Sequence, residues 1–164
     1  MPELLRALLA LEFDYAGGEG IDFEPYDAFL SEAETRAWFQ AWTGNSEVDG
    51  AEFRVFGQNG SGGYAAIWTV RQDSELLDQP VVFLGSEGEA GVVASSVNDL
   101  LWLLAGGLGP SEAVSYPSAR PENAQFAAFA IEHSPKTRKS ALDVLARAKA
   151  EFPDFEQRTL AAGR

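Results

Sequence analysis

The sequence predicts an α+β fold, a mainly antiparallel sheet of about four to six strands flanked by N-terminal and C-terminal helices. Apolar residues recur at helical spacing in the first 43 positions and again from residue 97 onward. Between them, positions 53–94 carry short apolar runs separated by glycine-rich turns. Strands that follow one another without helices between them pair as antiparallel neighbours. A length of 164 residues suits one domain over 1–164.

Two helices are predicted before the strands. The first covers about 2–13, where leucines recur at helical spacing and a glycine cluster follows. The second covers about 32–43, because Ser31 followed by Glu34 forms a capping box. Gly44 stands where a left-handed helix cap is favoured.

Four strands are predicted in a meander. The run 53–56 and the run 64–70 form a hairpin, because the segment 57–63 between them is rich in Gly and Asn that adopt positive φ. The continuous apolar run 80–84 and the run 91–94 follow, joined by a second glycine-containing turn.

Three helices are predicted after the strands. Ser96 and Asp99 cap a helix over 97–105, which is apolar on almost every side and must therefore be widely buried or in contact with a partner. A short helix follows near 123–131, and an amphipathic helix covers about 137–151.

Charge is the strongest signal in the composition. The chain has 25 Asp and Glu against 12 Lys and Arg, a formal net charge of −13 at pH 7. Residues 1–119 hold 19 acidic and 4 basic residues, whereas 120–164 hold 6 and 8. Such a field repels nucleic acid and speeds association with cationic proteins. It fits two interpretations, a solubilising surface and a face for a basic partner.

The composition also bears on location and cofactors. The longest apolar run, 100–105, is far below the roughly 20 residues of a membrane helix, so no membrane association is expected. The first residues lack the features of a signal peptide, which favours the cytoplasm. Absence of Cys removes disulfides, thiolate chemistry and the usual zinc-finger spacings, and no cofactor is expected.

Catalytic and metal-binding patterns are weak. The glycine-rich segment 57–63 leads into a strand, whereas phosphate loops open a helix. His133, the one histidine, has no nucleophile motif to serve. The acids Asp22, Glu24 and Asp27 lack the spacing of an EF-hand and are interpreted as a solvated loop.

Paired carboxylates offer one enzymatic alternative. Glu87 and Glu89 lie two residues apart, and two acids are the minimum for glycoside hydrolysis. Exposed acids on a turn keep ordinary pKa values, which suit a general acid poorly near neutral pH. We therefore expect no catalytic and no metal-binding residues, and keep an uncharacterised carboxylate-using hydrolase as a second alternative.

Three motifs, taken in order, carry a family resemblance. They are FGQNGSGGY over 56–64, PVVFLGSEGE over 80–89, and the capped Leu/Trp helix that follows, preceded by AWTGN at 41–45. In this order they resemble the SUKH superfamily, the Smi/Knr type, over nearly the whole chain. The resemblance implies an α+β fold without catalytic residues. It also implies that the shared positions primarily maintain the structure: Gly57, Gly60, Gly63, Glu87 and Gly88.

Members of that superfamily are chiefly bacterial immunity proteins that neutralise a cognate polymorphic toxin, often a nuclease. Others regulate fungal cell-wall synthesis. The resemblance therefore implies a non-enzymatic binding protein with a protein partner, a basic toxin domain. An anionic face suits the basic cleft of a nuclease. The alternative is a general interaction or regulatory module without a toxin partner. The predicted partner-binding residues are exposed acids around the sheet: Glu47, Asp49, Glu52, Asp73, Glu75, Asp78, Glu87 and Glu89.

Overall fold

The computed structural model describes residues 1–163 and confirms the predicted α+β fold. Five strands form one antiparallel sheet in the order β1-β2-β3-β4-β5. The strands are β1 (Glu24–Pro25), β2 (Phe53–Gln58), β3 (Tyr64–Trp68), β4 (Val81–Leu84) and β5 (Ala90–Ala94). The helices are α1 (Glu3–Leu9), α2 (Glu32–Thr43), α3 (Val97–Ala105), α4 (Pro110–Ser115), α5 (Ala124–His133), α6 (Ala141–Glu151) and α7 (Phe155–Ala162). Short 3-10 turns are η1 (Ala16–Gly18), η2 (Leu76–Asp78) and η3 (Pro135–Thr137).

The sheet contains the four predicted strands and one more. β1 pairs with the end of β2 at the edge of the sheet. Pro25 can occupy this position because an edge strand does not need every backbone donor. In β2 the pairing shifts between Val55 and Gly57, which marks a β-bulge. Val55 and Phe56 point to opposite faces of the sheet, as successive strand residues do.

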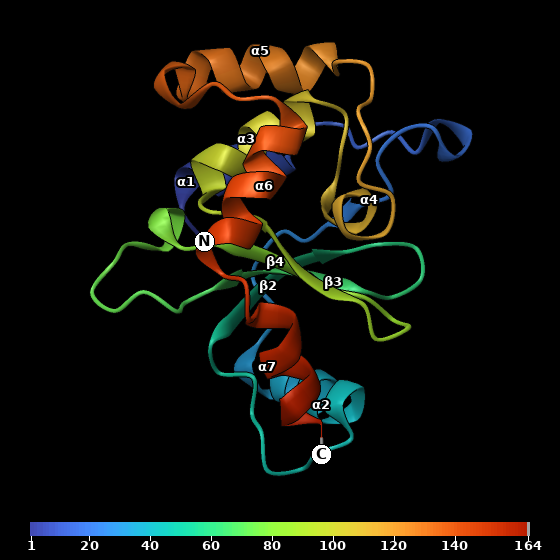
Figure 1. Cartoon of the computed structure of the whole chain (residues 1–164), viewed down its shortest axis with the longest axis vertical. Coiled ribbons are helices and arrows are strands. Elements are labelled where there is room, and N and C mark those ends of the chain that lie inside the picture. The colour runs from blue at the N-terminus through green and yellow to red at the C-terminus, as the bar shows by residue number, and fades with distance from the viewer. Residues whose placement is uncertain (164) are drawn as a thin grey trace.

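The first face of the sheet, here called the upper face, carries Phe56, Ile67 and Phe83. α1, α3 and α5 lie on this side of the sheet, above it in Figure 1, and α4 contacts β4 and β5. Their leucines and aromatic residues form the larger of two apolar clusters, in which nearly every member is fully buried. The all-round apolar character of α3 is thus explained by α5, α6 and the sheet enclosing it.

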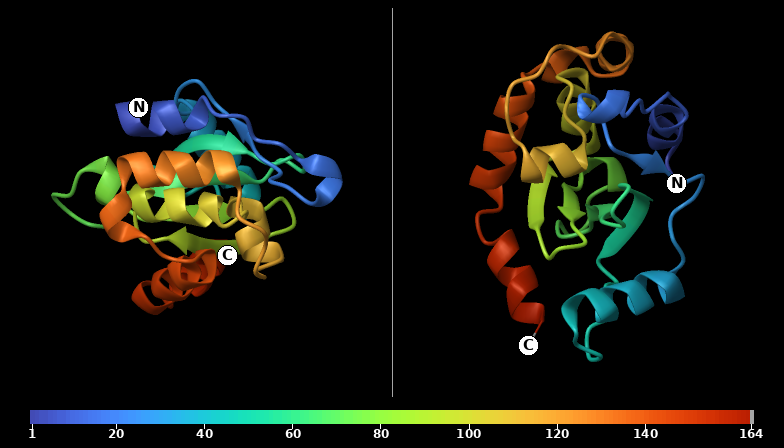
Figure 2. Two further views of the ribbon diagram at one scale, coloured as in Figure 1. Left: turned by 90° about the horizontal axis from the view of Figure 1, so that it is seen from above. Right: turned by 90° about the vertical axis from the view of Figure 1, so that its right-hand side faces the viewer.

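The opposite face, the lower face, carries Val55, Trp68 and Leu84. α2 and α7 cover it, and Figure 2 shows them on either side below the strands in the right-hand view. α6 runs along β5 and leads from the upper side of the sheet to α7 on the lower side. The cluster beneath this face is smaller and is bordered by partly buried aromatic side chains.

Helix boundaries agree with prediction for α2 and α3, whose caps are recognisable in the sequence. α2 has the predicted Ser31–Glu34 capping box and ends at Gly44 with φ 68°. α1 stops at Leu9, so the predicted 2–13 was too long, and α6 begins only after its cap Ser140. α4 and α7 were not predicted. Within the described part of the chain, no helix has the length and apolar character needed to cross a membrane.

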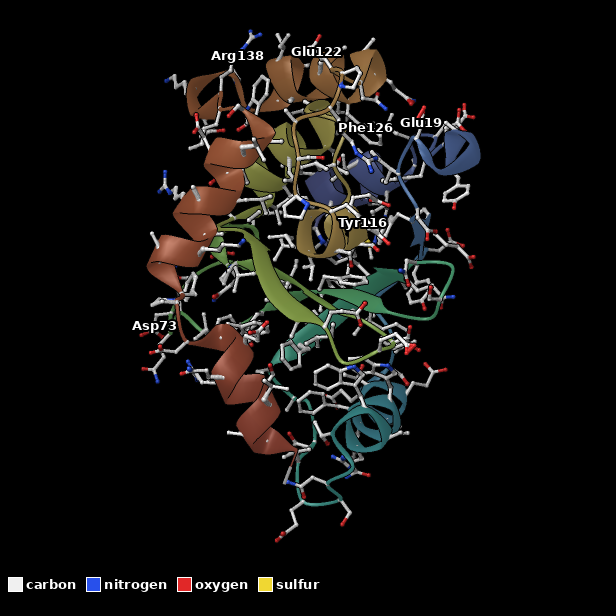
Figure 3. All side chains as sticks on the ribbon, turned by 45° about the vertical axis from the view of Figure 1, so that its right-hand side comes forward. Glu19, Asp73, Tyr116, Glu122, Phe126 and Arg138 are labelled. Atoms are coloured by element: carbon white, nitrogen blue, oxygen red, sulfur yellow. The ribbon has the colours of Figure 1, made fainter. Side chains whose placement is uncertain are left out.

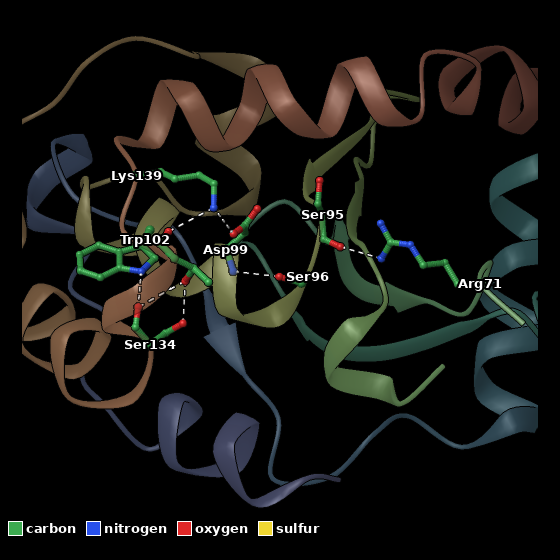
Figure 4. Close-up of polar contacts among 8 residues, drawn as sticks. Arg71, Ser95, Ser96, Asp99, Trp102, Ser134 and Lys139 are labelled. Carbon is green, nitrogen blue, oxygen red and sulfur yellow. Dashed lines mark hydrogen bonds and ion pairs between the residues drawn. The ribbon is translucent and has the colours of Figure 1, made fainter. Parts of the chain in front are cut away.

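One buried ion pair joins α3 to the segment before α6. Lys139 donates to Asp99 at 2.9 Å, and the Asp99 side chain is 4% exposed (Figure 4). The second oxygen of this carboxylate, Oδ2, has no hydrogen-bond partner in the described residues. Nearby, the Trp102 indole donates to the carbonyl of Ser134 at 2.9 Å. These contacts fix the connection between α5 and α6 over α3.

A polar network holds the β2–β3 hairpin against α4. Asn59 accepts from the Gly63 amide at 2.8 Å and donates to Ser111 of α4 at 3.0 Å. Glu112 of α4, which is buried, accepts from the amides of Asp22 and Gly109. Residues 59–63 therefore form a braced hairpin turn, whereas Gly57 and Gln58, predicted as part of the turn, extend β2.

Candidate functional site

A groove on the lower side of the sheet is the most prominent hollow near the predicted acids. It has a volume of about 470 Å³ and lies between the α2–β2 connection and α7. Its walls include the aromatic residues Phe39, Phe53, Trp68 and Phe155. These side chains are each no more than 4% exposed, so the groove has a rigid apolar base.

The α2–β2 connection is held in place by its own polar contacts. Gln40 donates to the carbonyls of Ser46 and Val48 at 3.1 and 3.0 Å. Gly50 has φ 65°, and a Cβ there would meet the Phe39 side chain at 3.0 Å. The connection therefore lies close over α2 and presents its acids to solvent.

Three predicted acids line the groove: Glu47, Asp49 and Glu52. Glu47 and Asp49 are exposed and Glu52 is half-buried. Asp49 accepts from the Ala51 amide at 3.0 Å, a local contact that orients its carboxylate. None of the three belongs to an ion pair in residues 1–163. Arg158 of α7 also lines the groove, with its guanidinium 5.2 Å from the centre of the Trp68 ring.

The next three predicted acids, Asp73, Glu75 and Asp78, lie on the β3–β4 connection and are exposed. This connection begins beside the groove, because Thr69 donates to the carbonyl of Glu52 from its amide and its hydroxyl, at 2.8 and 3.0 Å. In Figure 3, Asp73 projects on the side of the molecule away from Glu19.

Arg71 anchors that connection. Its guanidinium donates to the carbonyl of Asp78, to the carbonyl of Ser95 at 2.9 Å and to Glu151 at 2.6 Å. Six predicted acids thus share one end of the sheet, here called the acidic end: Glu47, Asp49, Glu52, Asp73, Glu75 and Asp78.

The remaining two predicted acids lie elsewhere. Glu87 and Glu89 belong to the β4–β5 turn, beyond Leu84, whereas the acidic end adjoins the Val81 end of the same strand. Four strand residues separate these ends by roughly 10 Å. Glu89 is half-buried and accepts from the Glu87 amide at 2.8 Å, so it braces the turn.

The other candidates stay dispersed. His133 ends α5, where it packs 4.2 Å from the Phe129 ring centre and 3.8 Å from Glu132. Asp22 accepts from the Gly60 amide and so belongs to the hairpin contacts. Within residues 1–163, no group of three or more His, Asp or Glu side chains is placed to hold a metal ion.

Sequence reasoning missed one wall of the groove. α7 contributes Phe155, Arg158 and Thr159. The apolar-facing pair Phe155 and Thr159 at i and i+4, after a Pro-Asp sequence, was a signal for this helix. Arg158 lies far from the groove's acids in the sequence, and no spacing pattern links it to them.

Comparison with known proteins gives no further guide, since no family model, curated protein or solved structure matches the chain.

Proposed function

We propose that the chain is a non-enzymatic binding protein whose acidic end docks on a basic surface of another protein. The observation that carries this proposal is the groove: three carboxylates without a cationic partner in residues 1–163 border an apolar base of buried aromatic residues. Exposed acids that face a basic partner speed its association and fix its orientation, while the buried aromatic residues hold the groove in shape.

The resemblance to the SUKH superfamily supports a narrower proposal. On that basis the partner is a toxin domain with a basic cleft, and the chain acts in the cytoplasm as its immunity protein. A nuclease cleft is lined by cations that hold phosphates, so the acids at the groove can occupy the positions of those phosphates.

The test uses the protein encoded by the gene next to that of this chain, purified with it as a complex. Calorimetric titrations between 0.05 and 0.5 M NaCl measure the dissociation constant, which we expect to rise about tenfold or more, because added salt screens an acidic face from a basic cleft. An affinity indifferent to salt contradicts the electrostatic part of the proposal, and a neighbour that does not bind contradicts the toxin partner.

A charge-matched pair of variants locates the contact. The triple variant Glu47→Gln, Asp49→Asn, Glu52→Gln removes three charges from the groove, while the side-chain carbonyl introduced at position 49 can still accept from the Ala51 amide. The control Glu3→Gln, Glu12→Gln, Glu132→Gln removes three charges from exposed positions elsewhere. We expect the groove variant to weaken binding about tenfold or more and the control to change it less than about threefold. Equal effects mean that only net charge matters.

A further inference from the structure

A second feature of the lower face lies at the end of the sheet opposite the acidic end. Four half-buried aromatic side chains meet there and are called here the aromatic end: Tyr26, Trp38, Trp42 and Tyr64. Trp38 stacks on Tyr64 with ring centres 4.5 Å apart and an angle of 26° between planes. Trp42 lies 6.0 Å beyond Trp38, and Tyr26 meets Tyr64 edge-on at 6.4 Å.

These rings are held in fixed positions. The Trp42 indole donates to the carbonyl of Gly85 at 2.6 Å, and the Tyr26 hydroxyl donates to Gln58. Trp38 and Trp42 stand one turn apart on α2, and Glu34 precedes Trp38 by one further turn on the same side of the helix. Rings fixed in this way lose little conformational entropy when another protein contacts them.

Negative charge accumulates beside the rings. Burial, together with Tyr64 and the charges of Glu24 and Glu34, raises the pKa of Tyr26 to about 12. Glu24 comes two residues before Tyr26 at the edge of the sheet and Glu34 one turn before Trp38 on α2, which brings both carboxylates to the aromatic end. Neither belongs to an ion pair in the described residues, so this charge has no cation opposite it.

The other two tryptophans of the chain, Trp68 and Trp102, each have an arginine side chain over the ring, unlike Trp38 and Trp42. Trp68 has the guanidinium of Arg158 at 5.2 Å from its ring centre, and Trp102 has that of Arg138 at 5.4 Å. Both indoles are buried, at 4% and 3% exposed. At the aromatic end no guanidinium of residues 1–163 lies over a ring, and the indoles remain half-buried.

We propose that the aromatic end binds an arginine side chain supplied by the partner protein. Its planar guanidinium packs against the solvent-exposed part of the Trp38–Tyr64 pair, whose facing surfaces are already in contact, while its donors reach Glu34 and Glu24. Arginine fits better than lysine because its flat group stacks on rings and forks toward a carboxylate. The partner protein comes from the proposed function, but recognition of arginine does not depend on the groove.

The test titrates the full chain, labelled with ¹⁵N, with the peptide acetyl-Gly-Arg-Gly-Arg-Gly-amide in about 0.15 M NaCl, where long-range attraction is screened. The four indole N–H signals report four separate places in the fold. We expect saturable shifts of the Trp38 and Trp42 signals and an unchanged Trp102 signal. The peptide with Lys in place of Arg should bind about threefold more weakly or worse.

A pair of variants on one helix turn supplies the control. Glu34→Gln removes the charge beside Trp38 and keeps the helix capped, because Gln serves at the same position of a capping box. Glu32→Gln removes the same charge two residues earlier, where the side chain lines a separate depression with Arg36. Binding should weaken about threefold or more in the first variant and stay unchanged in the second.

Each outcome decides between the two proposed surfaces. Shifts confined to Trp68 would place the arginine in the groove, which overturns the aromatic-end proposal and leaves the proposed function intact. Equal binding of the Arg and Lys peptides, equal effects of the two Glu variants, or absence of saturable shifts also overturns it. Shifts of Trp38 and Trp42 together with a partner that ignores the groove variant would support the aromatic end and contradict the groove.

Discussion

The two faces of the sheet differ in the side chains that border them rather than in the burial of their strand residues. On the upper face, Phe56, Ile67 and Phe83 are at most 1% exposed beneath helices. On the lower face, two helices leave a groove at one end and half-buried aromatic side chains at the other. The lower side therefore combines half-buried Trp and Tyr side chains with carboxylates that have no ion-pair partner in residues 1–163.

This difference separates stability from binding. Apolar surface already buried in the upper cluster stabilises the fold and cannot contribute to a complex. Half-buried Trp and Tyr side chains keep area that a partner can bury, and such residues dominate the energetics of many interfaces. Variants on the upper side should thus change stability, and variants on the lower side should change binding more than stability.

The largest expected difference follows from truncating one aromatic side chain on each face. Phe83→Ala leaves a cavity in the upper cluster and should lower the free energy of unfolding by about 3–5 kcal/mol. Trp38→Ala removes a half-buried ring and should cost about 1–2 kcal/mol. Urea unfolding followed by circular dichroism measures both. If the costs are equal, the lower face is as much a part of the core as the upper, and the comparison fails.

Breaking a buried ion pair and breaking a partly exposed one should also differ in their cost to stability, by a smaller amount. Lys139→Met leaves the buried Asp99 carboxylate without its cation and should cost about 3 kcal/mol. Glu151→Gln breaks the pair with Arg71, in which the Glu151 side chain is 38% exposed, and should cost about 0.5 kcal/mol. Thermal and urea unfolding give both values.

A double variant controls for the Lys139 result. Adding Asp99→Leu to Lys139→Met removes the stranded charge and should recover most of the lost stability, because an apolar pair of similar size replaces a buried ion pair at little cost. If stability is not recovered, the loss came from packing rather than from the unpaired carboxylate.

The part of the fold that the sequence predicts is the part with local determinants. α2 and α3 match their predicted bounds, since Ser31 and Ser96 cap them and Gly44 ends α2. β2 to β5 follow from apolar runs between glycine turns. β1 has only two residues, one of them Pro25, and exists because it pairs with β2 at the edge of the sheet. The sequence of these two residues alone does not predict that they form a strand.

Prediction of the site was limited in the same way, because local patterns are visible in the sequence and contacts between distant segments are not. The sequence showed which acids lie on connections, but not that Thr69 would bring the β3–β4 connection beside Glu52. It also did not show that α7 would place Arg158 over Trp68, more than 80 positions away in the chain. The groove arises from contacts between distant segments, and composition and spacing alone do not specify these.

The smallest expected effect is a difference in pH dependence between two glutamates. Burial raises the pKa of Glu112 on the upper side, although the backbone amide of Asp22, its own amide and the charge of Arg120 lower it in part. Burial alone would raise the pKa of Glu151, but the nearby Ser95 side chain and the hydrogen bond and charge of Arg71 outweigh it, so this pKa lies below its ordinary value. The two groups should therefore influence acid unfolding in opposite directions.

For Glu112 the folded chain holds its proton more tightly than the unfolded chain. Its contribution to stability is complete below the unfolded pKa and disappears as the pH rises through the folded pKa. In Glu112→Gln, stability should therefore fall more steeply than in the unsubstituted chain as the pH drops from 7 toward 4. The glutamine also loses one of two amide contacts, a cost of about 1 kcal/mol that is independent of pH.

For Glu151 the unfolded chain holds the proton more tightly. Its contribution is present above the unfolded pKa and disappears as the pH falls through the folded pKa. In Glu151→Gln, stability should therefore fall less steeply than in the unsubstituted chain below about pH 4.5, by ~0.5 kcal/mol because the pair is partly exposed. Urea unfolding at pH 7, 5.5, 4.5 and 3.5 measures both slopes. If the pH dependence of the unfolding free energy changes in the same direction in both variants, the pKa values of Glu112 and Glu151 are not shifted in opposite directions.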